Sequence, residues 1–229
     1  NMLALKSRLV KRGKELGFPL VGITGVQPFE MWHKALEKRM VLDPEAGKIR
    51  DRITFNPRDV MADAKAIVVA VYPYTPYSDD FPPGTGIYSA YYREYPRGRK
   101  AAGQLAEVIV KEGYDVIVEP PLPSKAAAYR SGLGWFGRNG VIYTQEYGSW
   151  VILYFILTNA PLPLDNRSQL KSLCGNCTLC VKACPTNAIS DEGAVLPGRC
   201  LRNFMLTSGS VPMDMREKLQ NSFLGCEIC

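Results

Sequence analysis

Seven cysteines are the residues of this sequence with the clearest chemistry, and all of them lie beyond residue 173. The first four follow the spacing Cys-x2-Cys-x2-Cys-x3-Cys-Pro, in which three thiolates bind one 4Fe-4S cube and the fourth reaches a neighbouring cluster. Paired cysteines also suit zinc, but a zinc site does not need four cysteines in one run followed by proline. The spacing therefore predicts an iron-sulfur module that transfers electrons. The candidate metal ligands are Cys174, Cys177, Cys180, Cys184, Cys200, Cys226 and Cys229.

The later cysteines predict a second 4Fe-4S cluster. We expect Cys184 to bind this cluster together with Cys200, Cys226 and Cys229, which leaves three cysteines for the first cluster. The ferredoxin pattern would place the missing ligand beyond Cys229, where this sequence stops. We therefore expect the natural protein to continue past Cys229. The alternative is a three-cysteine site whose fourth iron binds water or an external ligand.

Composition places the chain among globular proteins. Of its 229 residues, 46% are hydrophobic and 22% are charged, which suits one large domain or two small ones. The longest apolar run, Val151 to Leu157, is far shorter than the roughly 20 residues of a membrane helix. Clustered thiols without a secretion signal favour a reducing compartment. We expect a soluble cytoplasmic protein that contacts no membrane.

Hydrophobic periodicity predicts a mixed fold of the α/β (α+β) class in front of the cysteines. We expect one domain over residues 2–163, followed by a ferredoxin-like module over residues 164–229. The strand at 149–158 is apolar on both faces, so it should be central in a sheet. The other expected strands are 20–24, 66–71, 115–119 and 141–144; the expected helices are 2–16, one after Pro28, 98–112 and one from Ser124; a long loop is expected at 72–86.

A basic and aromatic stretch precedes the helix expected at 98–112. Arginines on such a stretch can bind phosphates while tyrosines stack on bases or on a flat cofactor. A solvated helix start with a half-buried aromatic face has the same pattern, so both interpretations stay open. The residues are Tyr88, Tyr91, Tyr92, Arg93, Tyr95, Arg97, Arg99 and Lys100.

Two glycine-containing motifs stand directly before the ferredoxin run. Residues 130–139 read RSGLGWFGRN and residues 145–150 read QEYGSW. In this order they resemble the epoxyqueuosine reductase family of cobalamin-dependent iron-sulfur enzymes, and the resemblance covers nearly the whole chain. It implies a cobalamin-binding domain similar to nitroreductases and reductive dehalogenases. It also implies an oxidoreductase of queuosine biosynthesis that acts on epoxyqueuosine in tRNA.

The resemblance also implies which residues lie near the cobalamin. Glycines permit close backbone approach, Trp135 offers a flat apolar face, and Arg138 and Asn139 suit amide or phosphate groups of a large cofactor. The alternative is a plain helix-to-strand turn with a core tryptophan. We treat His33 as structural. The implied cofactor-binding residues are Gly132, Leu133, Gly134, Trp135, Gly137, Arg138, Asn139, Tyr147, Gly148 and Ser149.

The candidate proton donor is Glu119. The family places an aspartate a few residues after the strand that precedes the GLGW helix, and here Glu119 is the nearest carboxylate. It would protonate the substrate if burial raises its pKa, but a solvated strand end would look the same. The expected partners are an electron donor protein or chemical reductant and, through the resemblance, tRNA. The alternatives are a paralogous reductase of another small molecule and a non-catalytic electron carrier or corrinoid-reducing protein.

Overall fold

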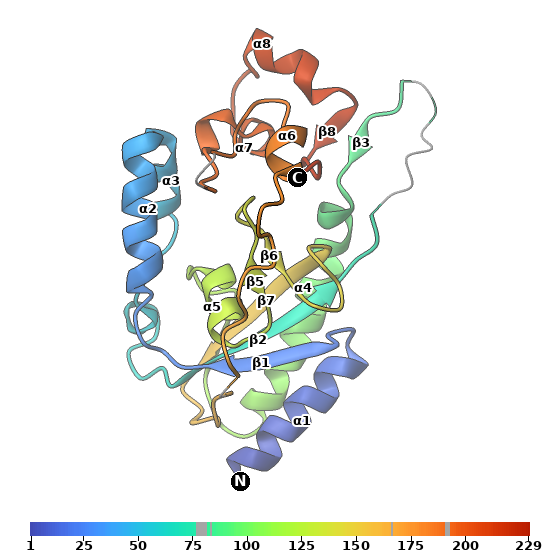
Figure 1. Ribbon diagram of the computed structural model, residues 1–229. Helices are drawn as coiled ribbons and strands as arrows, with labels where there is room; N and C mark the ends of the chain where they lie inside the picture. Colours follow the sequence, from blue (N-terminus) through green and yellow to red (C-terminus); the bar gives the residue numbers. More distant parts are fainter. Residues whose placement is uncertain (77–81, 83, 166, 191–192) are drawn as a thin grey trace.

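A four-stranded antiparallel sheet forms the centre of the fold (Figure 1). The structure is a computed structural model that describes residues 1–229 apart from 77–81, 83, 166 and 191–192. The strand order is β1-β2-β7-β4, and β7 pairs with β2 along its whole length and with β4 on its other side. The predicted central strand is thus confirmed. The strands are β1 (Leu20–Thr24), β2 (Ala66–Pro73), β4 (Val116–Val118) and β7 (Val151–Thr158).

Helices cover both faces of this sheet, which confirms the mixed α/β class. Helix α1 (Met2–Glu15) packs with α4 (Ala90–Val110) on one face, where Leu5 and Leu105 are fully buried. Helix α5 (Ser124–Arg130) covers the other face. Shorter elements of this part are α2 (Glu30–Leu42), η1 (Pro44–Ala46), α3 (Gly47–Arg50), η2 (Pro57–Asp59), β3 (Ile87–Tyr88), β5 (Trp135–Phe136) and β6 (Ile142–Tyr143).

Helix α4 begins eight residues earlier than predicted and continues through Pro96. Proline lacks a backbone N–H and normally ends a helix, so the sequence pattern favours a start at Gly98. Packing overrides this preference, because Tyr91 and Tyr95 lie against the core of the α4 face. The buried Tyr154 hydroxyl also donates a hydrogen bond of 2.6 Å to the Tyr95 carbonyl. The basic and aromatic stretch therefore forms the first turns of a long helix.

The cysteine module lies at the end of the molecule opposite α1 (Figure 1). Only three of its described hydrophobic residues, Ala188, Ile189 and Leu201, are buried. A module with so little core depends on its ligands and on the rest of the chain for stability. Its elements are α6 (Leu179–Ala183), η3 (Pro197–Arg199), α7 (Leu201–Leu206), α8 (Met213–Arg216), η4 (Glu217–Leu219) and β8 (Ser222–Leu224).

Two of the contacts that hold the module to the sheet domain involve strands. In the first, β8 pairs in parallel with β3, a contact that the sequence analysis did not predict. In the second, the segment after β7 returns along the free edge of β1, where the Asp165 carboxylate accepts the Ile23 N–H at 2.7 Å. The same carboxylate forms an ion pair of 2.9 Å with Lys6 of α1.

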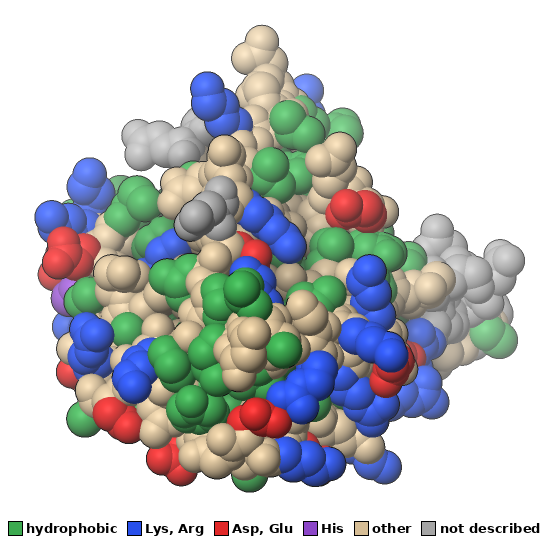
Figure 2. Space-filling model, turned by 90° about the horizontal axis from the view of Figure 1, so that it is seen from below, with side chains coloured by type: hydrophobic (Ala, Val, Ile, Leu, Met, Phe, Trp, Pro, Cys, Tyr) green, Lys and Arg blue, Asp and Glu red, His purple; other side chains and the backbone are tan. Residues whose placement is uncertain are grey.

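Two further expectations concern membrane-spanning helices and the long loop at 72–86. Within the described ranges, no helix combines the length and the apolar character needed to cross a bilayer. The predicted loop at 72–86 falls partly on residues 77–81 and 83, which lie outside the described residues. Seen from the α1 end, the surface mixes basic, acidic and hydrophobic side chains (Figure 2).

The two glycines inside α4 predict opposite effects of the same substitution. A methyl group added at Gly98 would meet the Tyr154 hydroxyl at 2.6 Å, whereas Gly103 has no neighbour within 4 Å of such a group. We expect Gly98→Ala to lower the free energy of unfolding by about 1–3 kcal/mol through overpacking. Gly103→Ala should raise it by up to about 1 kcal/mol through helix propensity. Urea unfolding followed by circular dichroism measures both, and a neutral Gly98→Ala would contradict the packing described here.

Candidate functional site

The four cysteines predicted to bind the second cluster lie close together. Burial, followed by the charges of Cys226, Cys200 and Cys184, raises the pKa of Cys229 to about 11. Burial and the charges of Cys200 and Cys184 also raise the pKa of Cys226. These shifts favour the protonated thiols, and a bound cation such as cluster iron would favour the thiolates instead. The four cysteines of the predicted second set thus lie within electrostatic reach of one another, as does Cys180 of the first set, and their role as one ligand set stays a prediction.

The first cysteine group forms an exposed turn. The Cys177 N–H donates to the Cys174 carbonyl at 2.7 Å, and the Cys177 side chain is exposed. The main-chain N–H of Arg138 points at the Cys174 sulfur, at 3.4 Å. Hydrogen bonds from Ser172 and from Arg138 lower the pKa of Cys174. Backbone N–H groups directed at sulfur are the contacts that tune iron-sulfur clusters.

Cys184 lies where the two cysteine groups meet, and its sulfur is also surrounded by donors. The Ala188 N–H lies 3.3 Å from this sulfur. Burial raises the pKa of Cys184, but hydrogen bonds from Thr186, Ala188 and Ile189 outweigh burial and lower it overall. Among the described residues, no three His, Cys, Asp or Glu side chains are arranged around a single metal ion.

The loop of the GLGW motif holds both cysteine groups. The Arg138 side chain donates to the carbonyls of Cys177 (3.2 Å) and Gly175 (3.1 Å) in the first group. The Asn139 side chain, which is 4% exposed, donates to the Cys229 carbonyl in the second group. Two neighbouring residues of one loop therefore fix the module on the sheet domain.

The other predicted cofactor-binding residues lie mainly against protein. Trp135 is 9% exposed and stacks on Tyr143 with 6.2 Å between ring centroids. Gly134 and Gly137 also lie against Tyr143, with no room for a side chain. Three further residues also contact protein: Gly132 packs on Arg167, Leu133 is buried on Gly22, and Tyr147 packs against the buried cluster on the α5 face of the sheet. Gly148 closes a turn beside Ser149 by pairing with Thr144. These contacts position the loop, and its role toward cobalamin stays a prediction.

Lys125 lies within electrostatic reach of two cations from other helices, Arg39 and Arg202, and of Cys200 and Cys229 in the second cysteine group. The Lys125 side chain is solvent-exposed and donates to the Gly140 carbonyl at 2.7 Å. Surrounding protein and the charges of Arg202 and Arg39 nevertheless lower its pKa to about 8, while Cys229 and Cys200 oppose this shift. The lysine amine is therefore close to other positive charges while its side chain remains in contact with solvent. The buried Arg39 Nε has no hydrogen-bond partner among the described residues.

Glu119 occupies a constrained position directly after β4. Its φ is 52°, which is unusual for a residue with a side chain, and its N–H bonds the Phe155 carbonyl at 2.8 Å. The Tyr95 hydroxyl donates to one carboxylate oxygen at 2.6 Å, and Arg99 contacts the other at 3.0 Å. The carboxylate is 17% exposed, so it is not a solvated strand end. Burial and the bond to Glu119 raise the pKa of Tyr95.

Sequence reasoning missed the partners of two carboxylates. Tyr95 and Arg99 lie four residues apart on one face of α4, a spacing that would have paired them had the helix been predicted to start before Gly98. Glu227 accepts hydrogen bonds from the Tyr74 hydroxyl (3.1 Å) and the Tyr91 N–H (3.2 Å). No local sequence signal marks Glu227, because its partners are more than 130 residues away.

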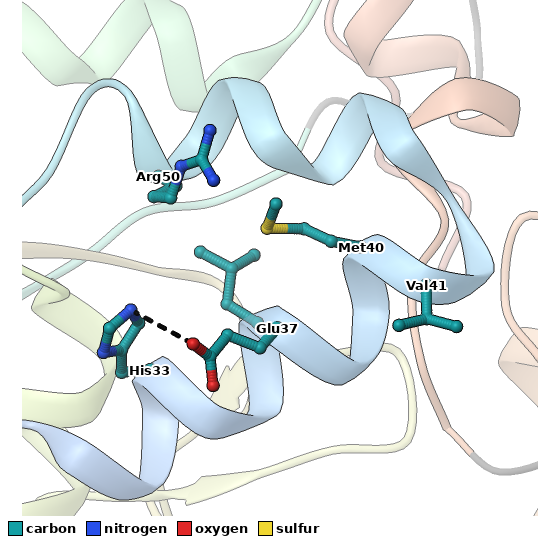
Figure 3. A pocket seen from close by; sticks show the side chains of 6 residues that line it. His33, Glu37, Met40, Val41 and Arg50 are labelled. Atoms are coloured by element: carbon teal, nitrogen blue, oxygen red, sulfur yellow. Dashed lines mark ion pairs between the residues drawn. The ribbon is translucent and has the colours of Figure 1, made fainter.

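A separate pocket of about 310 Å³ lies between α2 and α3 (Figure 3). His33 and Glu37 point toward one another there, with 3.9 Å between them. The His33 ring also stacks on Phe55 with 4.6 Å between centroids. His33 is thus engaged with its own surroundings, in keeping with a structural role.

Comparison with known proteins supports the interpretation of the cysteines. Residues 173–229 match the family model of the 4Fe-4S double cluster binding domain, which confirms the two-cluster prediction. An epoxyqueuosine reductase of Lactococcus garvieae is 30% identical, covering 100% of this chain and 68% of its own. The Bacillus subtilis epoxyqueuosine reductase is 29% identical, covering 100% and 63%. The chain therefore spans about two thirds of the length of these relatives.

Solved structures show the same similarity in the fold. An epoxyqueuosine reductase with an epoxyqueuosine-modified tRNA stem loop superimposes with a TM-score of 0.85 at 27% identity, covering 100% of this chain and 64% of that one. A Bacillus subtilis structure whose catalytic aspartate loop is swung out of the active site gives 0.83 at 29%, with coverage of 100% and 64%. A reductive dehalogenase associated with B12-dependent dehalogenation shares the fold, with a TM-score of 0.57 at 20% identity and coverage of 80% and 25%. By its sequence, its two-cluster module and its fold, this chain belongs to the epoxyqueuosine reductase family.

Proposed function

We propose that the chain is an iron-sulfur and cobalamin-dependent oxidoreductase that reduces epoxyqueuosine in tRNA. Residues 2–163 would form the cobalamin-binding domain, of nitroreductase-like type, and residues 164–229 the module with two 4Fe-4S clusters. One observation carries the proposal: Arg138 and Asn139 of the motif loop hold both cysteine groups against the sheet domain. Electron-carrying groups in the module would then lie beside the loop assigned to the cofactor.

The cysteine module fits two clusters. Cys184, Cys200, Cys226 and Cys229 supply four thiolates that lie within electrostatic reach of one another. Cys174, Cys177 and Cys180 supply three more on one short turn. Reduction of an epoxide to an alkene consumes two electrons and two protons and releases water. Clusters that carry single electrons suit such a stepwise supply.

The cations near the module would suit a large cofactor with an anionic group. Arg39, Lys125 and Arg202 contribute positive charge from three different helices. A phosphate group there would also provide the Arg39 Nε with an acceptor. Cobalamin, when bound, supplies a cobalt centre that takes up electrons and acts on the substrate. The chain's own part is to hold this cofactor between the module and Glu119.

Glu119 and Tyr95 form the proposed proton-delivering pair. The Tyr95 hydroxyl donates a hydrogen bond to one oxygen of the Glu119 carboxylate, while Arg99 holds the second oxygen. A proton held on a short hydrogen bond at a strand end is suitably placed to reach a bound substrate. The catalytic aspartate loop of the Bacillus subtilis relative makes an acid in a loop chemically consistent for this family.

A paralogous reductase acting on another small molecule is the second candidate. The observation that favours it is Glu119 itself, because glutamate stands where the family places aspartate. The longer side chain, held by Tyr95 and Arg99, would suit a substrate of different shape. Activity on an epoxyqueuosine stem loop distinguishes the two candidates.

The ligand assignment predicts how each cysteine variant affects the clusters. Cys200→Ser should remove the second cluster and leave the first, whereas Cys177→Ser should affect only the first. Iron and sulfide analysis of the anaerobically reconstituted chain, with EPR spectra of the reduced protein, measures both. Equal loss from either variant would contradict the division into two groups. Uptake of zinc and no iron by the unmodified chain would refute the iron-sulfur assignment.

The proton-delivering pair predicts a graded loss of activity. Glu119→Gln keeps the shape but removes the acid, so turnover of an epoxyqueuosine stem loop should fall roughly a hundredfold or more. Glu119→Asp should retain part of the activity, and Tyr95→Phe should lose an intermediate amount. Iron and cobalamin contents should stay normal in all three.

Glu112→Gln is the matched control, because Glu112 pairs with Arg8 far from this site. Rates equal to the unmodified chain in Glu119→Gln would exclude Glu119 from the reaction. No turnover by the unmodified, fully loaded chain would favour the paralogue.

A further inference from the structure

The surface around Cys177 has an unusual composition for a cysteine ligand turn. Leu173 and Leu179, on either side of Cys177, have exposed fractions of 76% and 75%. Cys177 is itself exposed. Large apolar side chains left in water on both sides of a metal ligand indicate a contact surface for another molecule.

The same surface is positively charged. Lys171 and Lys182 are exposed, and neither has an ion-pair partner within the described part of the chain. The sequence from 167 to 190 contains three basic residues and no acidic residue. On α6, Leu179 and Lys182 are three residues apart and therefore share one helix face. We call Lys171, Leu173, Cys177, Leu179 and Lys182 the Cys177 face.

The second cysteine group is less suited to an acidic partner. Both groups contact the motif loop, Cys177 through Arg138 and Cys229 through Asn139, so this contact does not distinguish them. Their surrounding charges do, because residues 213–229 contain three acidic and two basic residues, whereas residues 167–190 contain no acidic residue. The first group is therefore the better point of entry for electrons from an acidic carrier.

We propose that the Cys177 face is the docking site of a one-electron carrier protein with an acidic surface around its redox centre. In each encounter the carrier is oxidised by one electron and the first cluster is reduced by one electron, with no bond or proton transferred. Two encounters supply the electrons for one turnover. The proposal rests on the proposed clusters but is independent of the substrate.

The size and chemistry of the face suit a transient complex. Redox encounters bury little surface and rely on charge for fast association. The two lysines attract an acidic partner, and the small apolar centre between them excludes water from the contact. Because exposed charges are screened within about 3 Å at 1 M salt, the effect of the lysines should disappear there.

The test measures cluster reduction directly, without substrate. The reconstituted chain is mixed anaerobically with a reduced plant-type ferredoxin, an acidic one-electron carrier, and bleaching of the cluster absorbance is followed by stopped flow. Lys171→Glu with Lys182→Glu should lower the second-order rate constant roughly tenfold or more at low salt. At 1 M salt the rates of variant and unmodified chain should converge. Leu173→Gln with Leu179→Gln should slow reduction at both salt concentrations.

Two controls make the result specific to this face. Lys11→Glu with Lys14→Glu makes the same charge change on α1, at the opposite end of the molecule, and should leave the rate within about twofold. Reduction by an uncharged small molecule, photoreduced deazaflavin, should be equal in all variants. An unchanged rate in the Lys171 and Lys182 variant, or an equal loss in the α1 variant, would overturn the proposal. Failure to act on epoxyqueuosine would leave this measurement unaffected.

Discussion

One contact links the cysteine module to the helix that holds the candidate acid: Glu227 of the module meets the first turn of α4. The first N–H groups of a helix have no partner within it and carry partial positive charge, so a carboxylate stabilises them. Ser89 precedes α4 without a side-chain cap, and Glu227 accepts the Tyr91 N–H instead. The pairing of β3 with β8 brings the two together. Because Glu227 lies next to Cys226, ordering of the second cysteine group also orders the start of this helix.

Helix α4 connects that contact with the candidate acid. The Tyr91 ring, directly on the capped residue, stacks on Tyr95 with 5.9 Å between centroids and 25° between ring planes. The Tyr95 hydroxyl in turn bonds Glu119, which Arg99 holds from the next turn of the same helix. One rigid element therefore positions both the module proposed to deliver electrons and the group proposed to deliver protons. Such a shared support fixes the position of the two groups relative to one another.

Local pattern and long-range contact explain what the sequence could and could not predict. The cysteine spacing and the apolar strand 149–158 are each recognised from residues that are close in sequence, so the cluster ligands and the central strand could be predicted. The predicted start of α4 near Gly98 was wrong, because Pro96 is a strong local signal against a helix. Core packing of the preceding tyrosines outweighs that signal. The β3 and β8 pairing was missed since each strand is short and its partner is distant. Glu119 was identified, but its positive φ and its partners follow from packing alone.

In the motif loop, the residues that are easily recognised in the sequence mainly pack against protein. Its glycines are needed where backbone and the Tyr143 ring approach too closely for a side chain, and its tryptophan fills the space beside that ring. Arg39, Lys125 and Arg202, the three cations near the second cysteine group, belong to no motif and come from helices far apart in the sequence. The motif loop fixes the module through Arg138 and Asn139, whereas Glu119 and these cations carry the charges that a bound molecule would meet. Substrate choice by this chain should therefore be sought in those residues outside the motif, with the motif loop as their support.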